Sequence, residues 1–429
     1  MTPRFARHLD VLPGGLRLCT VELPHLHTAS LVMYAKVGSR FEDQRDNGLS
    51  HFLEHMLFRG TATHPDAYRL NYAIESLGGT LYAETARDYS LYQLSLHPDT
   101  LAPGMALLAE LFHAPVFEGL EVERRIILEE ILEDLDEDGG DINVDDVARA
   151  AAFPDHPLGY KITGPYANVE RFTLADVQRH FRRCYGARNL VLTVAGAVEH
   201  GAVLEQARAV MSAIPAGEAL AVSPPATRSD GPQLRTVENS GSQTSLQVLF
   251  RAVPETSADY PALTLLSRVL DDGMSTRLHH RICDELGLAY YVSGGIDSFS
   301  DAALFEIDAS SAHANVPAVL RESLALLSAL RERAPAEAEI DKAKRRYRWD
   351  LEASFDDPDS MAGWWGGTEL YYRPSSFEEK LERLNAVTGE DVRRVAEQVF
   401  RRDTLTVAAV GQLDDRTEDQ MRRTIETFR

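Results

Sequence analysis

The apolar positions of this chain follow two different periods, which predicts strands interleaved with helices. Runs typical of strands occur in LPGGLRLCTVELP (12–24), TASLVMYAKVG (28–38) and TSLQVLFRAV (244–253). Apolar residues at helical spacing occur in NGLSHFLEHMLFRG (47–60), where Ser50 is the expected N-cap and Gly60 the expected end. The pattern predicts an α+β protein whose sheets are rich in antiparallel strands and faced by helices.

Two segments of the chain resemble each other. Residues 173–196 match residues 388–411 without a gap, at a constant offset of 388 − 173 = 215. The identical pairs are Thr173 and Thr388, Asp176 and Asp391, Val177 and Val392, Arg179 and Arg394, Leu190 and Leu405, and Gly196 and Gly411. Chance similarity between two amphipathic helices is the alternative, but the constant register favours an internal duplication. We therefore expect two homologous halves, 1–215 and 234–429, joined by a Pro-, Ala- and Ser-rich linker at 216–233.

Composition narrows the class of protein and its partners. Hydrophobic residues make up 44% and charged residues 26% of the 429 residues, which is typical of a soluble globular protein of two to four domains. The formal net charge is −22, so we expect no nucleic-acid partner, because phosphate backbones would be repelled. The three scattered cysteines argue against a disulfide framework and against a thiolate zinc site.

The N-terminal residues MTPRFARHLDVLPGG contain basic residues but no apolar run as long as a signal-peptide core. No stretch of the chain approaches the length of a membrane span. The expected compartment is therefore the cytoplasm, and no membrane is expected as a partner. An export signal removed from the chain would instead place the protein in the periplasm.

The pentapeptide HFLEH at 51–55 carries the strongest chemical signal. On a helix, His51 and His55 lie one turn apart on the same face and can reach one ion, and Glu54 lies beside that face. This is HExxH reversed, and HxxEH is a known zinc-peptidase pattern. Zinc lowers the pKa of a bound water to about 7, so Glu54 could take its proton and later pass it to the leaving amine. The alternative is that the two histidines fill a core.

A catalytic zinc needs a third protein ligand, and the helical segment 121–138 offers the candidates. At about 100° per residue its apolar residues form one arc. They are Ile127, Leu128, Ile131, Leu132 and Leu135. Glu130 lies on the edge of that arc and is the carboxylate expected to enter a buried site. Glu123 lies on the same edge two turns earlier and could hydrogen-bond a ligand, whereas Glu129 and Glu133 should face solvent.

Taken together, these residues resemble the pitrilysin and mitochondrial processing peptidase family of inverted-motif zinc peptidases, the inverzincins. The family pattern is HxxEH followed some 75 residues later by a glutamate in a stretch similar to ER-x-V-I-x-x-E. ERRIILEE at 123–130 matches that stretch, and 130 − 55 = 75. The resemblance continues through GGTLYAETARDYSLY, HPLGYKITGP and MSTRLHHRICDELGLAYYVSG, and covers essentially the whole chain.

The resemblance implies a set of roles for these residues. One zinc ion per chain would be held by His51, His55 and Glu130, with Glu54 as the catalytic base and Glu123 as an accessory carboxylate. It also implies a clamshell of two homologous α+β halves, with the zinc in the N-terminal one. The short bacterial and mitochondrial members pair two such chains, so a homologous partner subunit is expected, as a heterodimer or a homodimer.

One departure from the family pattern lies in the C-terminal half. The family usually has an arginine seven residues before the tyrosine of GLAY, and this Arg–Tyr pair closes over the substrate near zinc. Here the tyrosine is Tyr290, and the position seven earlier is Cys283. Arg281 is near but out of register. Either a partner chain supplies the missing arginine, which we favour because the zinc residues are intact, or the chain is a weak enzyme.

A second departure lies in LYAETARDY, where Tyr82 replaces an asparagine that often precedes alanine in the family. The resemblance implies that this edge strand pairs with the substrate backbone, so Tyr82 and Ala83 are candidate substrate contacts. A packed strand aromatic is the alternative for Tyr82.

The sequence thus predicts a zinc endopeptidase that takes extended oligopeptides or unfolded segments into an enclosed chamber. The alternative is a non-catalytic assembly or scaffold subunit of a homologous complex. Such subunits typically lose the zinc residues, and this chain keeps all of them, which favours the peptidase.

Overall fold

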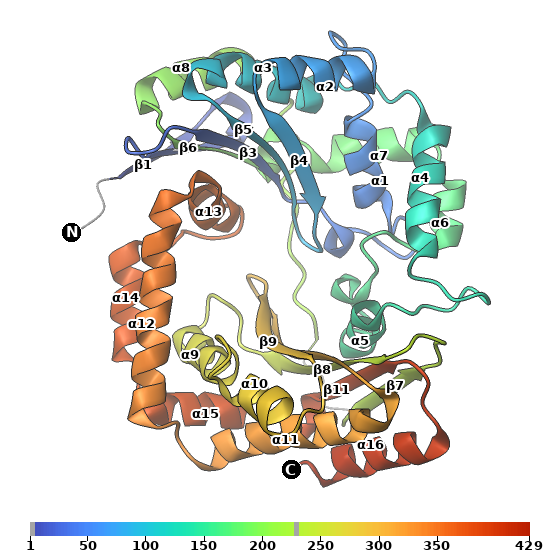
Figure 1. The fold of residues 1–429 in the computed structure, drawn as a ribbon. Coiled ribbons are helices and arrows are strands. Elements are labelled where there is room, and N and C mark those ends of the chain that lie inside the picture. The colour runs from blue at the N-terminus through green and yellow to red at the C-terminus, as the bar shows by residue number, and fades with distance from the viewer. Residues whose placement is uncertain (1–4, 227–230) are drawn as a thin grey trace. The chain divides into compact units, whose positions relative to one another are not determined.

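The computed structural model describes residues 5–226 and 231–429, which form two compact units (Figure 1). The first unit comprises the segments Met1–Glu133, Tyr160–Ser223 and Asp350–Pro374. The second unit comprises the segments Asp134–Gly159, Pro224–Trp349 and Ser375–Arg429. Each unit is built on a single mixed sheet.

The two sheets share the order and the directions of five strands, and the first sheet has one additional antiparallel strand at its edge. The first runs β1-β2-β6-β3-β5-β4, with strands β1 (Ala6–Val11), β2 (Arg17–Glu22), β3 (Ala29–Ala35), β4 (Thr80–Thr85), β5 (Ser90–Leu96) and β6 (Leu190–Gly196). The second runs β7-β11-β8-β10-β9, with strands β7 (Gln233–Val237), β8 (Thr244–Ala252), β9 (Tyr291–Ser298), β10 (Ala303–Ser311) and β11 (Thr406–Val410). Each sheet contains one parallel pair, which is β2 with β6 in the first sheet and β7 with β11 in the second. Beyond this pair, each sheet continues with three antiparallel pairs.

This shared topology confirms the predicted α+β class and the two homologous halves. The repeated segments lie at equivalent places, because each supplies a helix followed by the strand of the parallel pair. Thr173 with Asp176, and Thr388 with Asp391, form the same capping box at the start of that helix. Each hydroxyl accepts from the backbone N–H three residues later, so the same sequence signal starts both helices.

The helices divide between the units as follows. The first unit contains α1 (Leu49–Leu57), α2 (Ala67–Ser76), α3 (Leu101–His113), α4 (Leu120–Leu132), α6 (Tyr166–Arg171), α7 (Leu174–Cys184), α8 (His200–Met211) and α13 (Pro358–Ala362). The second contains α5 (Val144–Ala152), α9 (Tyr260–Leu270), α10 (Arg277–His279), α11 (Val316–Glu332), most of α12 (Glu337–Ala353), α14 (Phe377–Ala386), α15 (Gly389–Val399) and α16 (Asp415–Thr427). Among the described residues, no helix combines the length and apolar character needed to cross a bilayer.

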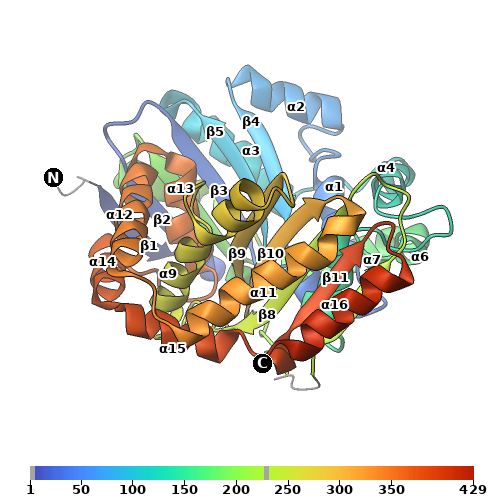
Figure 2. The same cartoon turned by 60° about the horizontal axis from the view of Figure 1, so that its bottom comes forward.

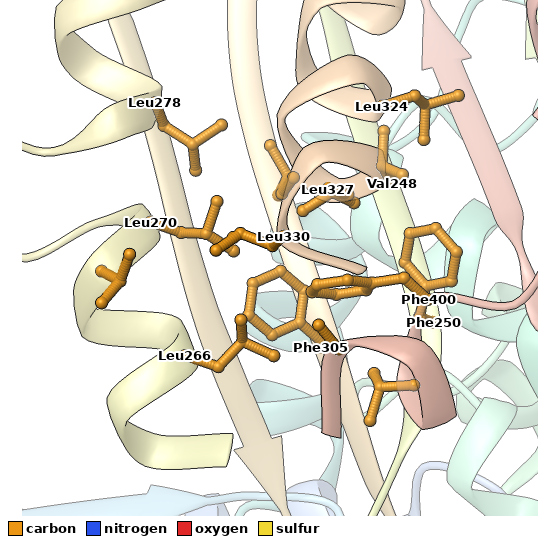
Figure 3. Close-up of a cluster of buried hydrophobic side chains, with 14 of the residues drawn as sticks. Val248, Phe250, Leu266, Leu270, Leu278, Phe305, Leu324, Leu327, Leu330 and Phe400 are labelled. Carbon is orange, nitrogen blue, oxygen red and sulfur yellow. The ribbon is translucent and has the colours of Figure 1, made fainter. Parts of the chain in front are cut away.

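The core of the second unit lies between its sheet and the helices α9, α11, α15 and α16 (Figures 2 and 3). Phe250, Phe305 and Phe400 meet at its centre, with ring centroids 5.3 Å apart for Phe250 and Phe400 and 5.0 Å apart for Phe305 and Phe400. Leucines of α9 and α11, including Leu266 and Leu327, surround these rings. The edge-to-face geometry of both ring pairs adds to the apolar burial.

Each sheet receives one covering helix from a distant part of the chain. Helix α13 and the following π-helical turn Gly363–Gly367 pack on β3 and β6 of the first sheet. Helix α5 packs on β8 and β11 of the second sheet, where Ala148 and Phe153 contact Leu249, Leu304 and Ala408. Each compact unit is therefore made of three separate segments of the chain, so one cut in the sequence does not separate the two units. The boundaries 1–215 and 234–429 stay a prediction, and residues 227–230 of the predicted linker lie outside the described residues.

Helix α5 is fixed to its sheet by a buried arginine. The guanidinium of Arg149 contacts Asp145 at 2.7 Å, Asp297 of β9 at 2.5 Å and Glu306 of β10 at 2.9 Å. Burial raises the pKa of Glu306 to about 7, opposed by the charge of Arg149 and supported by the neighbouring carboxylates. Removing the arginine would leave three carboxylates without their cation, so the cluster ties α5 to this sheet.

We expect Gly366→Ala to destabilise the first unit. A Cβ on Gly366 would lie 1.7 Å from Oγ1 of Thr193, which is fully buried on β6 and cannot move aside. Overpacking of this kind costs about 1–3 kcal/mol. Denaturant unfolding of the two proteins measures the difference. Gly295→Ala is the matched control, since a Cβ there meets no atom within 4 Å; equal stability of all three proteins would contradict the packing argument.

Several details of the sequence prediction are wrong. Helix α1 ends at Leu57, before the expected end at Gly60. Glu130, expected to enter a buried site, has a side chain that is 43% exposed. Ser50 is not the N-cap of α1, because the helix begins at Leu49 after Gly48. The helix expected over 121–138 ends at Leu132, and Leu132 is 49% exposed instead of completing the apolar arc. Ile127 and Ile131 are buried as expected, and Glu129 and Glu133 face solvent as expected.

Candidate metal centre

Helix α1 presents its two histidines on one side because another side is anchored in the core. Its fully buried apolar residues are Leu49, Phe52, Leu53, Met56 and Leu57. The helix packs against α7 and α4 of the same unit (Figure 1). His51 is 9% exposed, His55 is partly buried, and their rings lie 4.8 Å apart edge to face. Both imidazoles face a carboxylate, so the two histidines do not merely fill an apolar core.

That carboxylate belongs to Glu130 of α4. His51 Nε2 lies 3.5 Å from Glu130 Oε1, and His55 Nε2 lies 3.7 Å from Glu130 Oε2. One ligand atom from each of the three residues falls within 4.8 Å of the others. Ligands about 2.1 Å from a tetrahedral zinc ion lie roughly 3.4 Å apart, which is close to the 3.5 and 3.7 Å between the two histidines and Glu130. Within residues 5–226 and 231–429, this is the only group of three or more His, Cys, Asp or Glu side chains with such spacing.

The charge state of His51 suits a metal ligand. Burial, together with the neighbouring His55, lowers the pKa of His51 to about 3. The imidazole is therefore neutral at physiological pH and keeps a lone pair for an ion. Its 3.5 Å approach to Glu130 is consequently not an ion pair, but a contact between two groups that can share a cation.

Glu123 orients His55 from the side away from Glu130. Its Oε2 lies 3.2 Å from Nδ1 of His55, and its Oε1 accepts from Nη1 of Arg59 at 3.1 Å. Burial lowers the pKa of His55, but the hydrogen bond to Glu123 and the charges of Glu54 and Glu130 outweigh it, and the net shift is upward. A carboxylate on Nδ1 fixes the tautomer that leaves Nε2 as the ligand atom.

Glu54 follows on the same helix and is held by the end of β4. Its Oε2 accepts a hydrogen bond of 2.6 Å from Oγ1 of Thr85, which is itself 3.0 Å from Oγ of Ser90. Burial raises the pKa of the Glu54 carboxyl, partly offset by Thr85 and His55. A carboxyl of raised pKa is suited to taking up and releasing one proton near neutrality.

The candidate substrate contacts lie on two different units. Tyr82 and Ala83 are on β4, the outermost strand of the first sheet, and pair with Gln93 and Tyr92 of β5. Tyr82 is 52% exposed and its hydroxyl donates to Glu84 at 3.1 Å, so the packed-aromatic alternative is wrong. Tyr290 of the second unit precedes β9 and is 94% exposed.

The position that departs from the family pattern holds a thiol. Cys283 lies in the π-helical turn His280–Glu285 of the second unit and is partly buried. Burial and the charges of Asp284 and Asp271 raise the pKa of the Cys283 thiol. Arg281 is held by Glu285 at 2.9 Å and by Glu322 at 3.0 Å. It is therefore engaged within its own unit, and Cys283 supplies no cation beside Tyr290.

Sequence reasoning missed two side chains that support this site. Arg59, the partner of Glu123, lies in the turn after α1, two residues beyond its end at Leu57, so helical spacing does not place it beside His55. Thr85, the partner of Glu54, comes from a strand 31 residues away. No local pattern marks it, because only the pairing of β4 with the rest of the sheet brings it to α1.

A mixed fold with two imidazoles and a carboxylate converging from two helices defines a class: α+β proteins with a candidate mononuclear zinc centre. The chain matches the family model described as Insulinase (Peptidase family M16) over residues 17–166. It also matches the model described as Peptidase M16 inactive domain over residues 171–347. The chain belongs to this M16, or pitrilysin, family of peptidases.

Relatives and solved structures agree with that assignment. An uncharacterized zinc protease of Streptomyces coelicolor is 31% identical over 420 residues, covering 96% of this chain and 90% of that protein. The mitochondrial-processing peptidase subunit beta of Blastocladiella emersonii is 31% identical over 426 residues, covering 94% of this chain and 88% of that protein. The crystal structure of a protease from Helicobacter pylori has a TM-score of 0.87 at 21% identity, covering 95% of this chain and 99% of that one.

Proposed function

We propose that this chain is a zinc-dependent endopeptidase that cleaves extended oligopeptides or unfolded segments, with one zinc ion held by His51, His55 and Glu130. The observation that carries the proposal is the convergence of these three side chains at 3.5 and 3.7 Å, with Glu54 on the same helix. Two imidazoles and one carboxylate leave a fourth tetrahedral position open, as a catalytic zinc requires.

In this proposal each residue has a separate task. A bound zinc ion would supply Lewis acidity to the attacking water and the scissile carbonyl. Glu54 accepts a proton from that water on Oε1, because Thr85 occupies Oε2, and then donates it to the leaving amine. Glu123 keeps His55 in the correct tautomer. The free edge of β4 at Tyr82 and Ala83 pairs with the peptide backbone.

Removal of the metal tests the proposal directly. We expect a zinc chelator to abolish cleavage of a quenched fluorescent peptide and stoichiometric zinc to restore it, with one zinc bound per chain by elemental analysis. Both His51 and His55 must be unprotonated to bind zinc, so rebinding should weaken as the pH falls below the raised pKa of His55. Cleavage that persists in the metal-free protein would contradict the proposal.

We further propose that full activity requires a homologous partner chain. Tyr290 has no arginine at the position of Cys283, and Arg281 is held by Glu285 and Glu322. An arginine from a partner would orient the peptide carbonyl or stabilise the oxyanion, which a thiol does far less well.

The cytoplasmic location of the protein stays a prediction.

The lone chain and the chain mixed with any homologous subunit encoded beside it should be compared on the same peptide. Robust turnover by the lone chain would remove the partner requirement. Zinc binding without turnover in either preparation would instead favour the non-catalytic assembly subunit.

A further inference from the structure

The helix that carries the metal ligands lacks a side-chain cap of its own. Its N-cap is Gly48, with φ = 103°, a left-handed conformation that favours glycine. A Cβ on Gly48 would lie 2.7 Å from the carbonyl oxygen of Thr163 and 3.0 Å from Cα of Gly164. The loop at 163–164 therefore occupies the space of an ordinary N-cap side chain, and the first N–H groups of α1 must find another acceptor.

A carboxylate six residues earlier supplies that acceptor. Glu42 Oε1 accepts from the backbone N–H of Ser50 at 2.6 Å, and Oε2 accepts from that of Gly48 at 2.9 Å. The side-chain amide of Asn47 donates to Oε2 at 3.0 Å and also donates to the carbonyl of Lys161 at 2.7 Å. Glu42 is only 4% exposed. A buried carboxylate at this place satisfies the orphan donors and complements the positive end of the helix.

The carboxylate of Glu42 also takes part in a buried network of side-chain hydrogen bonds. The hydroxyl of Ser50 also hydrogen-bonds Glu42, and its Oγ lies 3.0 Å from Nε2 of His180 on α7. Burial lowers the pKa of His180 to about 3, so this imidazole is neutral. Because the Ser50 hydroxyl donates its proton to Glu42, the matching tautomer of His180 is the one that donates Nε2–H to the Ser50 oxygen. Glu42, Ser50 and His180 thus form one chain of hydrogen bonds that fixes the first turn of α1 against α7.

That first turn contains His51, the residue directly after Ser50. We propose that Glu42 is a positioning residue for the metal centre: its buried carboxylate caps α1 and sets the place of His51 and Glu54 relative to Glu130. The inference rests on the proposed zinc function and adds to it a residue that touches neither the ion nor the substrate. Glu42 acts through backbone N–H groups, so its loss should change metal affinity and turnover together.

Glu42→Gln tests this with little change in volume. An amide NH₂ would face the N–H of Gly48 or Ser50, leaving a buried donor without an acceptor. We expect the dissociation constant for zinc, measured by competition with a chromophoric chelator, to rise about 10- to 100-fold. We expect kcat on a quenched fluorescent peptide to fall by a similar factor with KM nearly unchanged. Glu42→Asp keeps the charge and should recover part of both.

Asp66→Ala is the control for loss of a helix cap as such, because alanine has no side-chain acceptor for the first N–H groups of the helix. Asp66 caps α2 in the same unit, accepting from the N–H of Arg69 at 2.8 Å, and α2 carries none of the metal ligands. This variant should lower the melting temperature without changing zinc affinity or kcat. A folded Glu42→Gln with wild-type zinc affinity and kcat would overturn the inference while leaving the zinc function standing.

If Glu42→Gln does not fold, Ser50→Ala takes its place, since it removes one donor from Glu42 and keeps the backbone contact. Zinc affinity weakened in that variant supports the inference, and wild-type affinity overturns it. Wild-type protein that neither binds zinc nor cleaves peptide would reject the proposed function, and the role of Glu42 with it. The two failures are therefore distinguished by the wild-type protein alone.

Discussion

Glu54→Gln is expected to abolish peptide cleavage while the protein continues to bind zinc. The glutamine has the same shape and still accepts the hydrogen bond of Thr85, but its amide cannot take a proton from water. General base catalysis contributes about 10²- to 10⁴-fold, so kcat should fall by that factor. Zinc content by elemental analysis and KM should stay near the wild-type values, because Glu54 is not among the three clustered ligands.

Glu84→Gln separates the chemistry of Glu54 from a general effect of charge. Glu84 lies on β4, contacts the hydroxyls of Tyr82 and Tyr89, and contributes to the electrostatic field at Glu54. Its loss removes one negative charge from the neighbourhood and should leave kcat nearly unchanged. Equal loss of activity in both variants would mean that Glu54 acts as a charge and not as the base, and full activity in Glu54→Gln would exclude it altogether.

Glu130→Gln is expected to lose both the metal and the activity. The carboxylate bridges the space between His51 and His55, at 3.5 and 3.7 Å from their Nε2 atoms, and a neutral amide is a poor zinc ligand. Loss of a group that merely supports a ligand costs about 10- to 100-fold in metal affinity, so loss of the ligand itself should exceed 100-fold. His51→Ala should behave in the same way. Zinc retained after dialysis, together with kcat, measures both effects.

The adjacent residue offers the matched control. Glu129→Gln removes the same charge from the same turn of α4, but Glu129 faces solvent and lies outside the cluster. Its zinc content and kcat should equal those of the wild type. If Glu130→Gln kept its zinc and its activity, the third ligand would have to be another residue and the assignment of α4 to the centre would be wrong.

Local patterns predicted much of the fold because their physical causes are local. The capping boxes at Thr173 and Thr388 need only residues three positions apart, so the repeat could be seen in the sequence and recurs at equivalent places in both sheets. The end of α4 at Leu132 was not predicted, since Leu135 continues the helical spacing of apolar residues beyond it. Nor did any pattern show that α5 and α13 cover sheets formed by distant parts of the chain.

The sequence by itself determined which residues can act together as ligands of one metal ion. His51 and His55 share a helix face because four residues make about one turn, and Glu130 lies at the edge of an apolar arc. Only the tertiary structure brought α4 beside α1, gave Glu54 its partner Thr85, and placed Glu42 at the start of α1. These contacts join residues whose separation along the chain carries no periodic signal, so they depend on how helices and strands pack, which no local spacing specifies.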